Sequence, residues 1–248
     1  MLFTLFDRPA PECQAESCDA LRESVSQRVL DLLAVFLLAF VALPVIGVAA
    51  IVVRCNSRGG AFYTQVRLGR GGRKFHILKL RSMVHNCEAA SGICWAHQND
   101  PRVTAVGRVL RKFHIDELPQ LWNVLCGDMS LVGPRPERPE IVAELERVVP
   151  GYCDRLRVNP GVTGLAQIQL PSDQDIHSVR DKLAYDRAYV ERRGLGLDLR
   201  ILFGTLLYLA GFSYASTRRL AFLPLVRLPI APVAELPQLC YASVSAEG

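Results

Sequence analysis

The sequence predicts a small α+β domain, mostly helical, that is attached to a membrane by an apolar N-terminal helix. Three observations carry this prediction. Residues 32–53 form a run of 22 residues without a charged side chain. Two strand-like runs flank a glycine-rich turn at residues 69–72, a pattern typical of a β-hairpin. Apolar residues recur at helical spacing in residues 103–113 and 118–125, so short amphipathic helices complete the fold.

Length, charge and cysteine usage limit the class of protein. The 248 residues can bury one sizeable core or two small ones. Residues 54–112 contain twelve lysines and arginines against only Glu88 and Asp100. A basic segment favours phosphates of lipids, nucleotides or nucleic acid, and composition does not choose among them. The eight cysteines lack paired Cys-x-x-Cys spacing, which disfavours a zinc site or a compact disulfide framework and favours reduced thiols.

The apolar run is long enough to act as a membrane helix. At about 1.5 Å per residue it would extend roughly 33 Å, against a bilayer core of about 30 Å. Pro44 lies near its middle, where the loss of one backbone hydrogen bond should kink the helix. Arginines follow the run at positions 54, 58, 67 and 70 and mark its C-terminal side as cytoplasmic. These physical arguments alone favour a single pass.

The predicted hairpin ends in two cations. Lys79 and Arg81 leave its second strand two residues apart, so they are expected on one strand face. Their position allows two interpretations: a solvated strand end, or cations that bind phosphate in an active site.

The strongest chemical pattern lies in residues 115–137. Asp116 and Glu117 directly precede a helical pattern that stops at Gly127. The pair can be an N-cap with an acidic first turn. It can also be a pair of ionised carboxylates whose pKa is kept low by nearby arginines. Such carboxylates can attack phosphorus or hold a divalent metal, and spacing alone does not decide between these uses.

A stiff loop and a basic helix flank this pair. The loop Gly133-Pro134-Arg135-Pro136 presents one guanidinium, whose fork suits bidentate phosphate binding. The upstream helix carries Arg111 among other cations and an apolar stripe on another side. Such a helix can pack on a core or lie on an anionic membrane surface.

The C-terminal third offers two more helices and a proline-rich end. Tyr185, Asp186 and Tyr189 lie on a predicted helix that ends near residues 193–194. Residues 201–212 are uncharged and mainly apolar, too short to span a bilayer but suited to a buried or interfacial helix. Four prolines from residue 224 to 237 rule out a long helix at the end.

The chain resembles the bacterial sugar transferases that load polyprenyl phosphate, the monotopic phosphoglycosyl transferases. The resemblance extends over roughly residues 28–208. It rests on these stretches, in this order: KLRSM, NDPRVTAVGRVLR, DELPQLWNVLCGDMSLVGPRPERP, PGVTGLAQI and KLAYDRAYV. Several long motifs in the correct order are far more specific than one short signature.

The resemblance implies transfer of a sugar 1-phosphate from a nucleotide diphosphate sugar, such as a UDP-sugar, to polyprenyl (undecaprenyl) phosphate. This reaction initiates exopolysaccharide, O-antigen or other glycoconjugate synthesis. The resemblance implies Asp116 as the nucleophile, Glu117 as the ligand of Mg²⁺ and Arg111 as a catalytic cation. It assigns substrate binding to Lys79, Arg81, Pro134, Arg135 and Pro136, and it implies that residues 160–164 frame the substrate pocket.

The resemblance also implies a monotopic protein of the bacterial inner (cytoplasmic) membrane, with its catalytic domain on the cytoplasmic face. The apolar helix would re-enter the same side after a break at Leu43-Pro44. We expect a polar segment 1–27, a re-entrant membrane helix 28–54, a catalytic domain 55–212 and a proline-rich tail 213–248. Membrane lipids are expected partners and nucleic acid is not. The oligomeric state stays open, with a homodimer as one option.

Two other classes of protein remain. One is a non-catalytic, membrane-anchored basic binding protein, in which the acid pair and the Arg135 loop are structural. The other is a non-enzymatic assembly subunit, against which the intact acid pair argues. Release of a nucleoside monophosphate from a nucleotide sugar would separate an enzyme from both. His114 departs from the small hydroxyl residue expected at its position, and we interpret it as a tolerated substitution.

Overall fold

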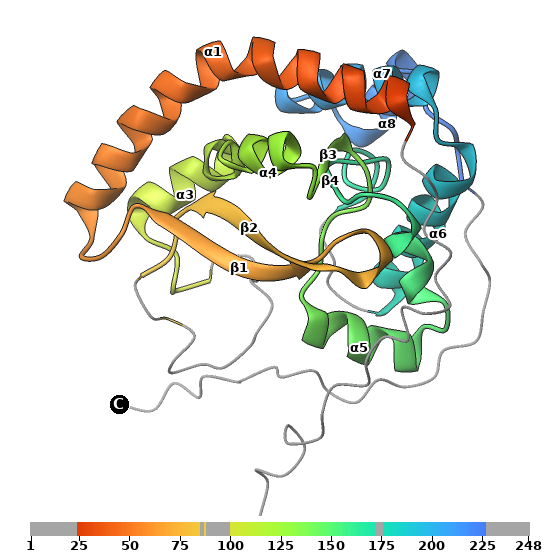
Figure 1. Ribbon diagram of the computed structural model, residues 1–248, viewed down its shortest axis with the longest axis horizontal. Helices are drawn as coiled ribbons and strands as arrows, with labels where there is room; N and C mark the ends of the chain where they lie inside the picture. Colours follow the sequence, from red (N-terminus) through yellow and green to blue (C-terminus); the bar gives the residue numbers. More distant parts are fainter. Residues whose placement is uncertain (1–23, 85–86, 88–99, 172–175, 227–248) are drawn as a thin grey trace, which may run out of the picture.

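The computed structural model describes residues 24–84, 87, 100–171 and 176–226. Most of their regular structure is helical, with two small sheets (Figure 1), as the sequence predicts. The elements are α1 (Val25–Asn56), β1 (Phe62–Leu68), η2 (Arg70–Gly72), β2 (Lys74–Leu80), α3 (Ala105–Lys112), η3 (Ile115–Glu117), α4 (Gln120–Cys126), β3 (Ser130–Val132), α5 (Pro139–Val148), η4 (Tyr152–Arg157), β4 (Gly161–Thr163), α6 (Ile176–Arg192), α7 (Leu195–Leu209) and α8 (Tyr214–Leu220).

The predicted hairpin is confirmed. β1 and β2 pair antiparallel, from Phe62 opposite Leu80 to Leu68 opposite Lys74. Its turn contains Gly71 and Gly72 with φ of 64° and 77°, a region that glycine adopts without steric cost. The second sheet is a short parallel pair, β3 with β4, and it brings the chain after residue 130 next to the chain after residue 161.

α1 is one continuous helix, so the predicted break at Leu43-Pro44 is wrong. Pro44 lies inside the helix, and Figure 1 shows α1 as a bent arc over the rest of the domain. A proline removes one hydrogen bond and bends a helix, but intact turns on both sides can carry the helix through. Among the described residues, α1 alone is long and apolar enough to cross a membrane, and 17% of its most apolar window is buried.

Polar contacts near the N-terminus of α1 attach it to the domain. Asp31, 1% exposed, accepts from Ser130 Oγ at 2.6 Å and from the Leu131 amide at 3.0 Å. Gln27 donates to the Tyr189 hydroxyl of α6 at 3.0 Å. A buried carboxylate needs such partners. These contacts therefore fix the N-terminal end of α1 against β3 and α6.

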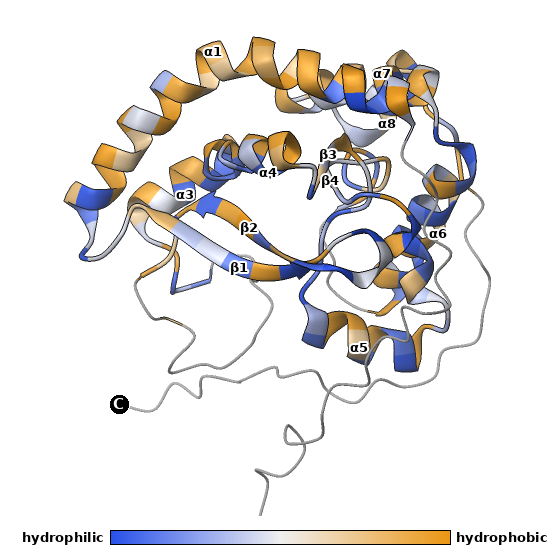
Figure 2. Ribbon diagram, viewed as in Figure 1, coloured by the Kyte–Doolittle hydropathy of each residue, from blue (hydrophilic) through white to orange (hydrophobic). Residues whose placement is uncertain are grey.

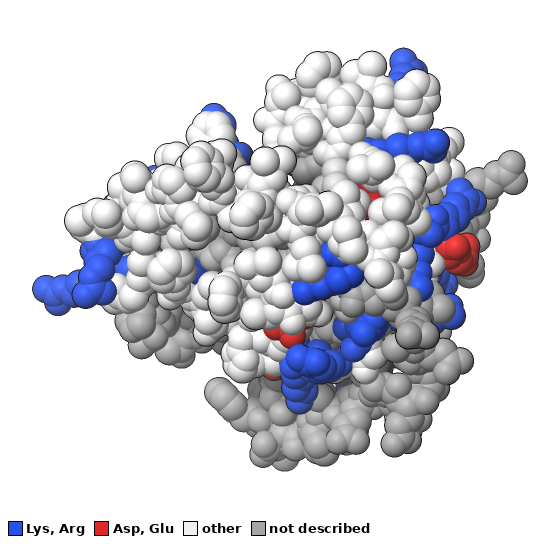
Figure 3. Space-filling model, turned by 45° about the horizontal axis from the view of Figure 1, so that its top comes forward, with Lys and Arg blue, Asp and Glu red and all other residues white. Residues whose placement is uncertain are grey.

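Several helices of one half of the molecule are rich in apolar residues (Figure 2), and many of their large apolar side chains are exposed. We call this surface the apolar face. Figure 3 shows a broad surface there with few charged side chains, and lysines and arginines along its margins. A soluble core helix would be mostly buried, whereas α1 is not. The large exposed apolar residues include Phe36, Phe40 and Ile51 of α1, Val109 of α3, Trp122 and Leu125 of α4, Phe203 and Leu206 of α7, and Leu220 of α8.

The main core lies between the parallel strands, α6, α7 and the segment after α8. Ile201 of α7 is fully buried, and Ala221 and Leu223 pack into the same core. The folded part therefore continues past residue 212, where we expected the tail to begin. The seven-residue α8 ends before the first of the four prolines, at residue 224. The segments 1–23 and 227–248 lie outside the described residues.

The described cysteines differ in state. Cys55, Cys87 and Cys126 form no disulfide, as expected. Cys153 is disulfide-bonded, so the expectation of reduced thiols is wrong at that position. Sequence spacing does not show which cysteines the fold brings within the roughly 5.5 Å between Cα atoms that a disulfide needs.

Candidate active site

A tight turn after α3 presents the two adjacent carboxylates. Thr104 caps α3 by accepting from the Gly107 amide at 2.9 Å. After the helix, His114 adopts φ 54° in the left-handed region, which histidine tolerates better than most non-glycine residues. The chain then enters η3, which holds Asp116 and Glu117. The reversal at His114 thus places both carboxylates directly after the basic end of α3.

α4 follows the two carboxylates but is not capped by them. Its N-cap position is Pro119, without a side-chain cap, and Gly127 ends it with φ 84°. The N-cap interpretation of Asp116 is therefore wrong, whereas the predicted stop at Gly127 is confirmed. Asn123 of α4 accepts from the Leu78 amide at 3.0 Å and donates to the His76 carbonyl at 2.8 Å. This amide fixes α4 against β2, beside Lys79.

Glu117 is held between two cations. Its Oε1 accepts from Lys79 Nζ at 2.8 Å and from Arg135 Nη2 at 2.5 Å, and its Oε2 lies 3.3 Å from Arg135 Nη1. Burial acts to raise the pKa of Glu117, but the charges of Arg135 and Lys79 outweigh burial and hold that pKa well below its ordinary value. Glu117 is therefore ionised and positionally fixed.

Asp116 has the opposite environment. It is 7% exposed, and none of the described residues donates a hydrogen bond to its carboxylate or forms an ion pair with it. Burial first, and then the charge of Glu117, raise the pKa of Asp116, although Lys79, Arg111 and Arg135 act to lower it. The expectation of a low pKa is therefore confirmed for Glu117 and wrong for Asp116. Its carboxylate oxygens remain available to a ligand.

The loop that carries Arg135 rests directly on the Pro160–Gly164 turn. The Gly133 amide donates to Thr163 O at 2.9 Å, and the Gly161 amide donates to Pro134 O at 2.9 Å. A Cβ on Gly161 would lie 2.1 Å from the Gly133 nitrogen, so these two backbones can approach only because both residues are glycine. The two motifs, distant in sequence, thus form one support for Arg135.

The structure brings together four of the predicted site residues: Lys79, Asp116, Glu117 and Arg135. Arg111 lies near enough to lower the pKa of Asp116, and its Nε donates to Ser82 Oγ at 2.8 Å. Pro134 and Pro136 flank Arg135 in the loop.

Arg81 is not part of this group, which corrects the expectation that it binds substrate with Lys79. Its guanidinium donates to the carbonyl oxygens of Ser57 and Arg58 at 2.8 and 2.5 Å. β2 ends at Leu80, so the alternation that places every second residue on one face no longer applies to Arg81. Arg81 instead ties the end of α1 to the hairpin.

The chemistry of Glu117 is compatible with a magnesium ion shared with a substrate. Proteins usually bind Mg²⁺ through one or two carboxylates together with substrate phosphates. Oε2 of Glu117 has a single contact, and a carboxylate offers about four acceptor sites, so Glu117 can still bind a metal. The described residues contain no group of three or more His, Cys, Asp or Glu side chains that could hold a metal alone.

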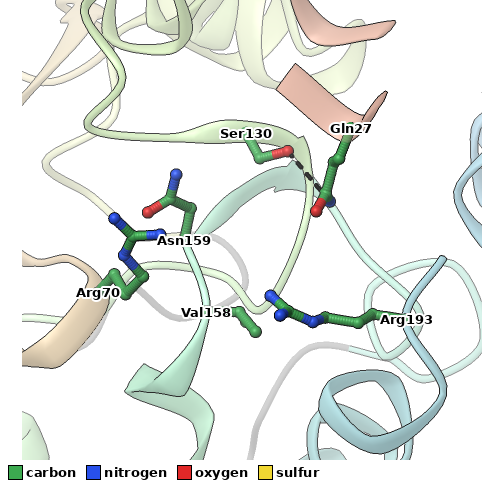
Figure 4. A pocket seen from close by; sticks show the side chains of 6 residues that line it. All are labelled: Gln27, Arg70, Ser130, Val158, Asn159 and Arg193. Carbon is green, nitrogen blue, oxygen red and sulfur yellow. Dashed lines mark hydrogen bonds between the residues drawn. The ribbon is translucent and has the colours of Figure 1, made fainter. Parts of the chain in front are cut away.

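A separate small pocket lies between the N-terminal end of α1, β3 and the turn after α6 (Figure 4). It shares no residue with the carboxylate site, and its lining contains no carboxylate. It therefore lacks the carboxylate chemistry of Asp116 and Glu117, which decides the location of the candidate active site. The pocket is lined by Gln27, Arg70, Ser130, Val158, Asn159 and Arg193.

Most of the chain matches known proteins. A family model described as "Bacterial sugar transferase" matches residues 22–211. The chain is 41% identical over 188 residues to the UDP-N-acetylgalactosamine-undecaprenyl-phosphate N-acetylgalactosaminephosphotransferase of Aeromonas hydrophila, covering 75% of this chain and 44% of that protein. It is 42% identical over 181 residues to the UDP-glucose:undecaprenyl-phosphate glucose-1-phosphate transferase of Caulobacter vibrioides, covering 72% and 67%.

A third relative is covered almost completely. The exopolysaccharide production protein PSS of Rhizobium leguminosarum is 36% identical over 187 residues, which cover 73% of this chain and 93% of that protein. The chain spans less than half of the Aeromonas protein. The family model covers most of the chain, including Lys79, both carboxylates and Arg135. The chain belongs to the bacterial sugar transferase family.

Proposed function

We propose that this protein transfers a sugar 1-phosphate from a nucleotide diphosphate sugar to undecaprenyl phosphate, through a covalent phosphosugar intermediate on Asp116. The observation that carries the proposal is the contrast within the acid pair. Glu117 is fixed between Lys79 and Arg135, whereas Asp116 has no partner among the described residues. The names of the Aeromonas and Caulobacter relatives support a UDP-sugar as donor and undecaprenyl phosphate as acceptor.

In the first step, an Asp116 carboxylate oxygen attacks the sugar-linked phosphorus of the donor. A new O–P bond forms to Asp116, and the P–O bond to the nucleoside monophosphate breaks. The monophosphate leaves with the electron pair of that bond. Arg135 and Arg111 stabilise negative charge on the phosphoryl oxygens, a contribution that preorganised cations make effectively in a buried site. Mg²⁺, when bound at Glu117, would neutralise charge on the diphosphate and on the leaving group.

In the second step, a phosphate oxygen of undecaprenyl phosphate attacks the phosphorus bound to Asp116. The acyl phosphate bond breaks, the Asp116 carboxylate is restored, and the product is an undecaprenyl diphosphate sugar. An aspartyl phosphate splits one difficult displacement into two easier ones. The same cations can serve both steps because the reacting phosphorus carries equivalent charge in each.

The apolar face supports an enzyme whose two substrates come from different phases. The donor is soluble, whereas the acceptor is confined to the bilayer. We place the apolar face in one leaflet of the bacterial inner membrane, with α1 re-entering the cytoplasmic side through its bend and the catalytic domain in the cytoplasm. Amphipathic helices with exposed aromatic and aliphatic side chains favour such a position. The product would initiate exopolysaccharide or related glycoconjugate synthesis.

A covalent-trapping experiment tests this proposal. The full chain in detergent is incubated with UDP-glucose or UDP-N-acetylgalactosamine labelled in the sugar, without lipid acceptor. We expect label on the protein, release of UMP, and discharge of the label when undecaprenyl phosphate is added. Peptide mapping should place the label on Asp116, and the Asp116→Asn variant should stay unlabelled.

Other results would contradict parts of the proposal. Label on Glu117 would reverse the assignment within the acid pair. Turnover without label would favour direct transfer in a ternary complex. Absence of monophosphate release from a panel of nucleotide sugars would favour a basic binding protein.

A further inference from the structure

The motif at residues 182–190 has no part in the chemistry above, yet one of its residues, Asp186, belongs to a buried ion pair. Asp186 of α6 contacts Arg155 of η4, with Oδ2 and Nη2 separated by 2.8 Å and side chains 3% and 2% exposed. Placing two charges in a protein interior has a desolvation cost that mutual attraction often only balances. Global stability is therefore a weak explanation for this pair, and its other contacts have to be considered.

The guanidinium of Arg155 has several contacts besides Asp186. Nη1 donates to the Tyr152 hydroxyl, and the group lies over the Tyr152 ring at 4.9 Å from its centroid. Nη2 donates to the backbone carbonyl of Arg135 at 2.9 Å. Arg155 thus binds the main chain of Arg135, and the side chain of Arg135 forms the ion pair with Glu117.

This contact belongs to a continuous row. Four successive carbonyl oxygens of the loop each accept a hydrogen bond, two from backbone amides and two from arginine side chains. Pro134 and Pro136 contribute no N–H, so the loop is held mainly through these oxygens. The four contacts are Gly161 N to Pro134 O at 2.9 Å, Arg155 Nη2 to Arg135 O at 2.9 Å, Arg67 Nη1 to Pro136 O at 3.1 Å, and Leu68 N to Glu137 O at 3.0 Å.

Arginine is required at position 155 by this geometry. One guanidinium must contact the Asp186 carboxylate, the Tyr152 hydroxyl and the Arg135 carbonyl at the same time. A planar fork with five donors can do this, whereas a lysine offers a single ammonium on a flexible stem. Asp186 in turn neutralises the buried guanidinium, so the two residues act as a unit.

We infer that the Arg155–Asp186 pair positions the catalytic loop, by fixing the backbone at Arg135 so that its guanidinium faces Glu117 and the substrate phosphate. This inference rests on the proposed function, because the consequence is a loss of phosphate stabilisation. Arg155 and Asp186 are positioning residues and do not touch the reacting atoms.

A double-mutant cycle with Arg135 tests the inference. Release of UMP is measured for the wild type, Arg155→Lys, Arg135→Ala and the double variant of the full chain. We expect Arg155→Lys to lower kcat/KM by about 10- to 100-fold, mainly through kcat, because a displacement of about 1 Å can cost on the order of 100-fold. In the Arg135→Ala background the same substitution should cost at most about twofold, because residues that act through one another are not additive.

The chain provides a matched control. Arg187 and Asp154 join the same two elements, α6 and η4, at the same 2.8 Å, but they are 40% and 48% exposed and do not contact the loop. Asp154→Asn should leave kcat/KM within about twofold of wild type, because exposed pairs contribute little.

Each outcome is decisive. Equal effects of Arg155→Lys with and without Arg135 would overturn the positioning role while leaving the proposed function intact, and so would a loss confined to thermal stability. A wild type without monophosphate release would instead count against the proposed function. If Arg155→Lys does not fold, Tyr152→Phe replaces it in the cycle. That variant removes one hydroxyl acceptor, and we expect a smaller loss that again disappears in the Arg135→Ala background.

Discussion

Glu117 and Glu137 lie in two regions with the same local chemistry. Glu117 contacts Lys79 at 2.8 Å and Arg135 at 2.5 Å, and Glu137 contacts Lys182 at 3.4 Å and Arg67 at 3.3 Å. In both regions burial acts to raise the pKa of the glutamate, but the neighbouring cations lower it overall. Each glutamate is therefore an ionised, fixed anchor.

The regions differ in the second carboxylate beside each anchor. Near Glu137, Asp186 is paired with Arg155, and the arginines of this region donate to loop carbonyls. Next to Glu117, Asp116 has no such partner among the described residues, and its pKa is raised. Paired charges hold a backbone in place, whereas an unpaired carboxylate among cations is available for reaction. The region around Glu137 thus holds the loop that places Arg135 beside Glu117 and Asp116.

The largest expected effect is the loss of turnover when Asp116 is replaced, compared with the loss of stability when Glu137 is replaced. Asp116→Asn should lower turnover by about 10⁴-fold or more, because an amide cannot attack phosphorus. The raised pKa means that ionised Asp116 destabilises the fold above that pKa, so the variant should melt at the same or a higher temperature at pH 7. Glu137→Gln should instead lower stability by about 3 kcal/mol, because it removes the buried negative charge that Arg67 and Lys182 contact, and it should retain measurable turnover. Thermal melts and UMP release measure stability and turnover for both variants. Lost stability in Asp116→Asn with lost turnover in Glu137→Gln would contradict the assigned roles of the two carboxylates.

The next effect concerns the cations of the site. Arg135→Ala and Arg111→Ala should each lower activity by about 100-fold, as when a preorganised donor to a transition state is lost. Membrane association should persist, because neither side chain forms the apolar face. Arg108→Ala is the control, since Arg108 is an exposed cation of the same helix as Arg111 and should keep near-native turnover. Near-native turnover of either site variant would assign that arginine a structural role.

A smaller effect appears in the pH dependence. Asp116 must be ionised to attack, so activity should fall at acid pH through its raised pKa. Glu117→Gln removes the charge that raises this pKa and leaves Lys79 and Arg135 to lower it. The acid limb of the residual activity should therefore move to lower pH, and higher Mg²⁺ should restore part of the rate. Asp128→Asn, which alters only a pair with the exposed Arg73, should leave the limb in place. An acid limb that stays in place in Glu117→Gln would show that Asp116 is not the titrating group.

The smallest effect concerns the bend in α1. With a re-entrant α1, tags at the N-terminus and after Val53 should both be accessible only from the cytoplasm. Pro44→Ala should straighten α1 and move a fraction of molecules to a spanning state. Gly47→Ala is the control, because a Cβ there meets no atom within 4 Å and removes no bend. An N-terminal tag of the wild type labelled only from outside would establish a single pass instead.

The sequence by itself determined the local elements. Apolar length identified α1, strand-like runs around a glycine-rich turn identified the hairpin, and helical spacing with Gly127 identified α4, because each of these patterns acts within a few residues. Several motifs in order also located the acid pair and Arg135. Periodicity alone could not tell what covers an apolar stripe, and the structure leaves Trp122 and Leu125 of α4 exposed.

Only the tertiary structure decided how the charges pair. Lys79 and Arg135 meet at Glu117 from 38 and 18 residues away, whereas Arg81, two residues from Lys79, turns to the end of α1. Asp186 acquires its role through Arg155, which reaches the Arg135 carbonyl. An ionisable side chain has many candidate partners in a sequence, and packing fixes which of them lie within about 4 Å and out of water, where charge interactions become strong.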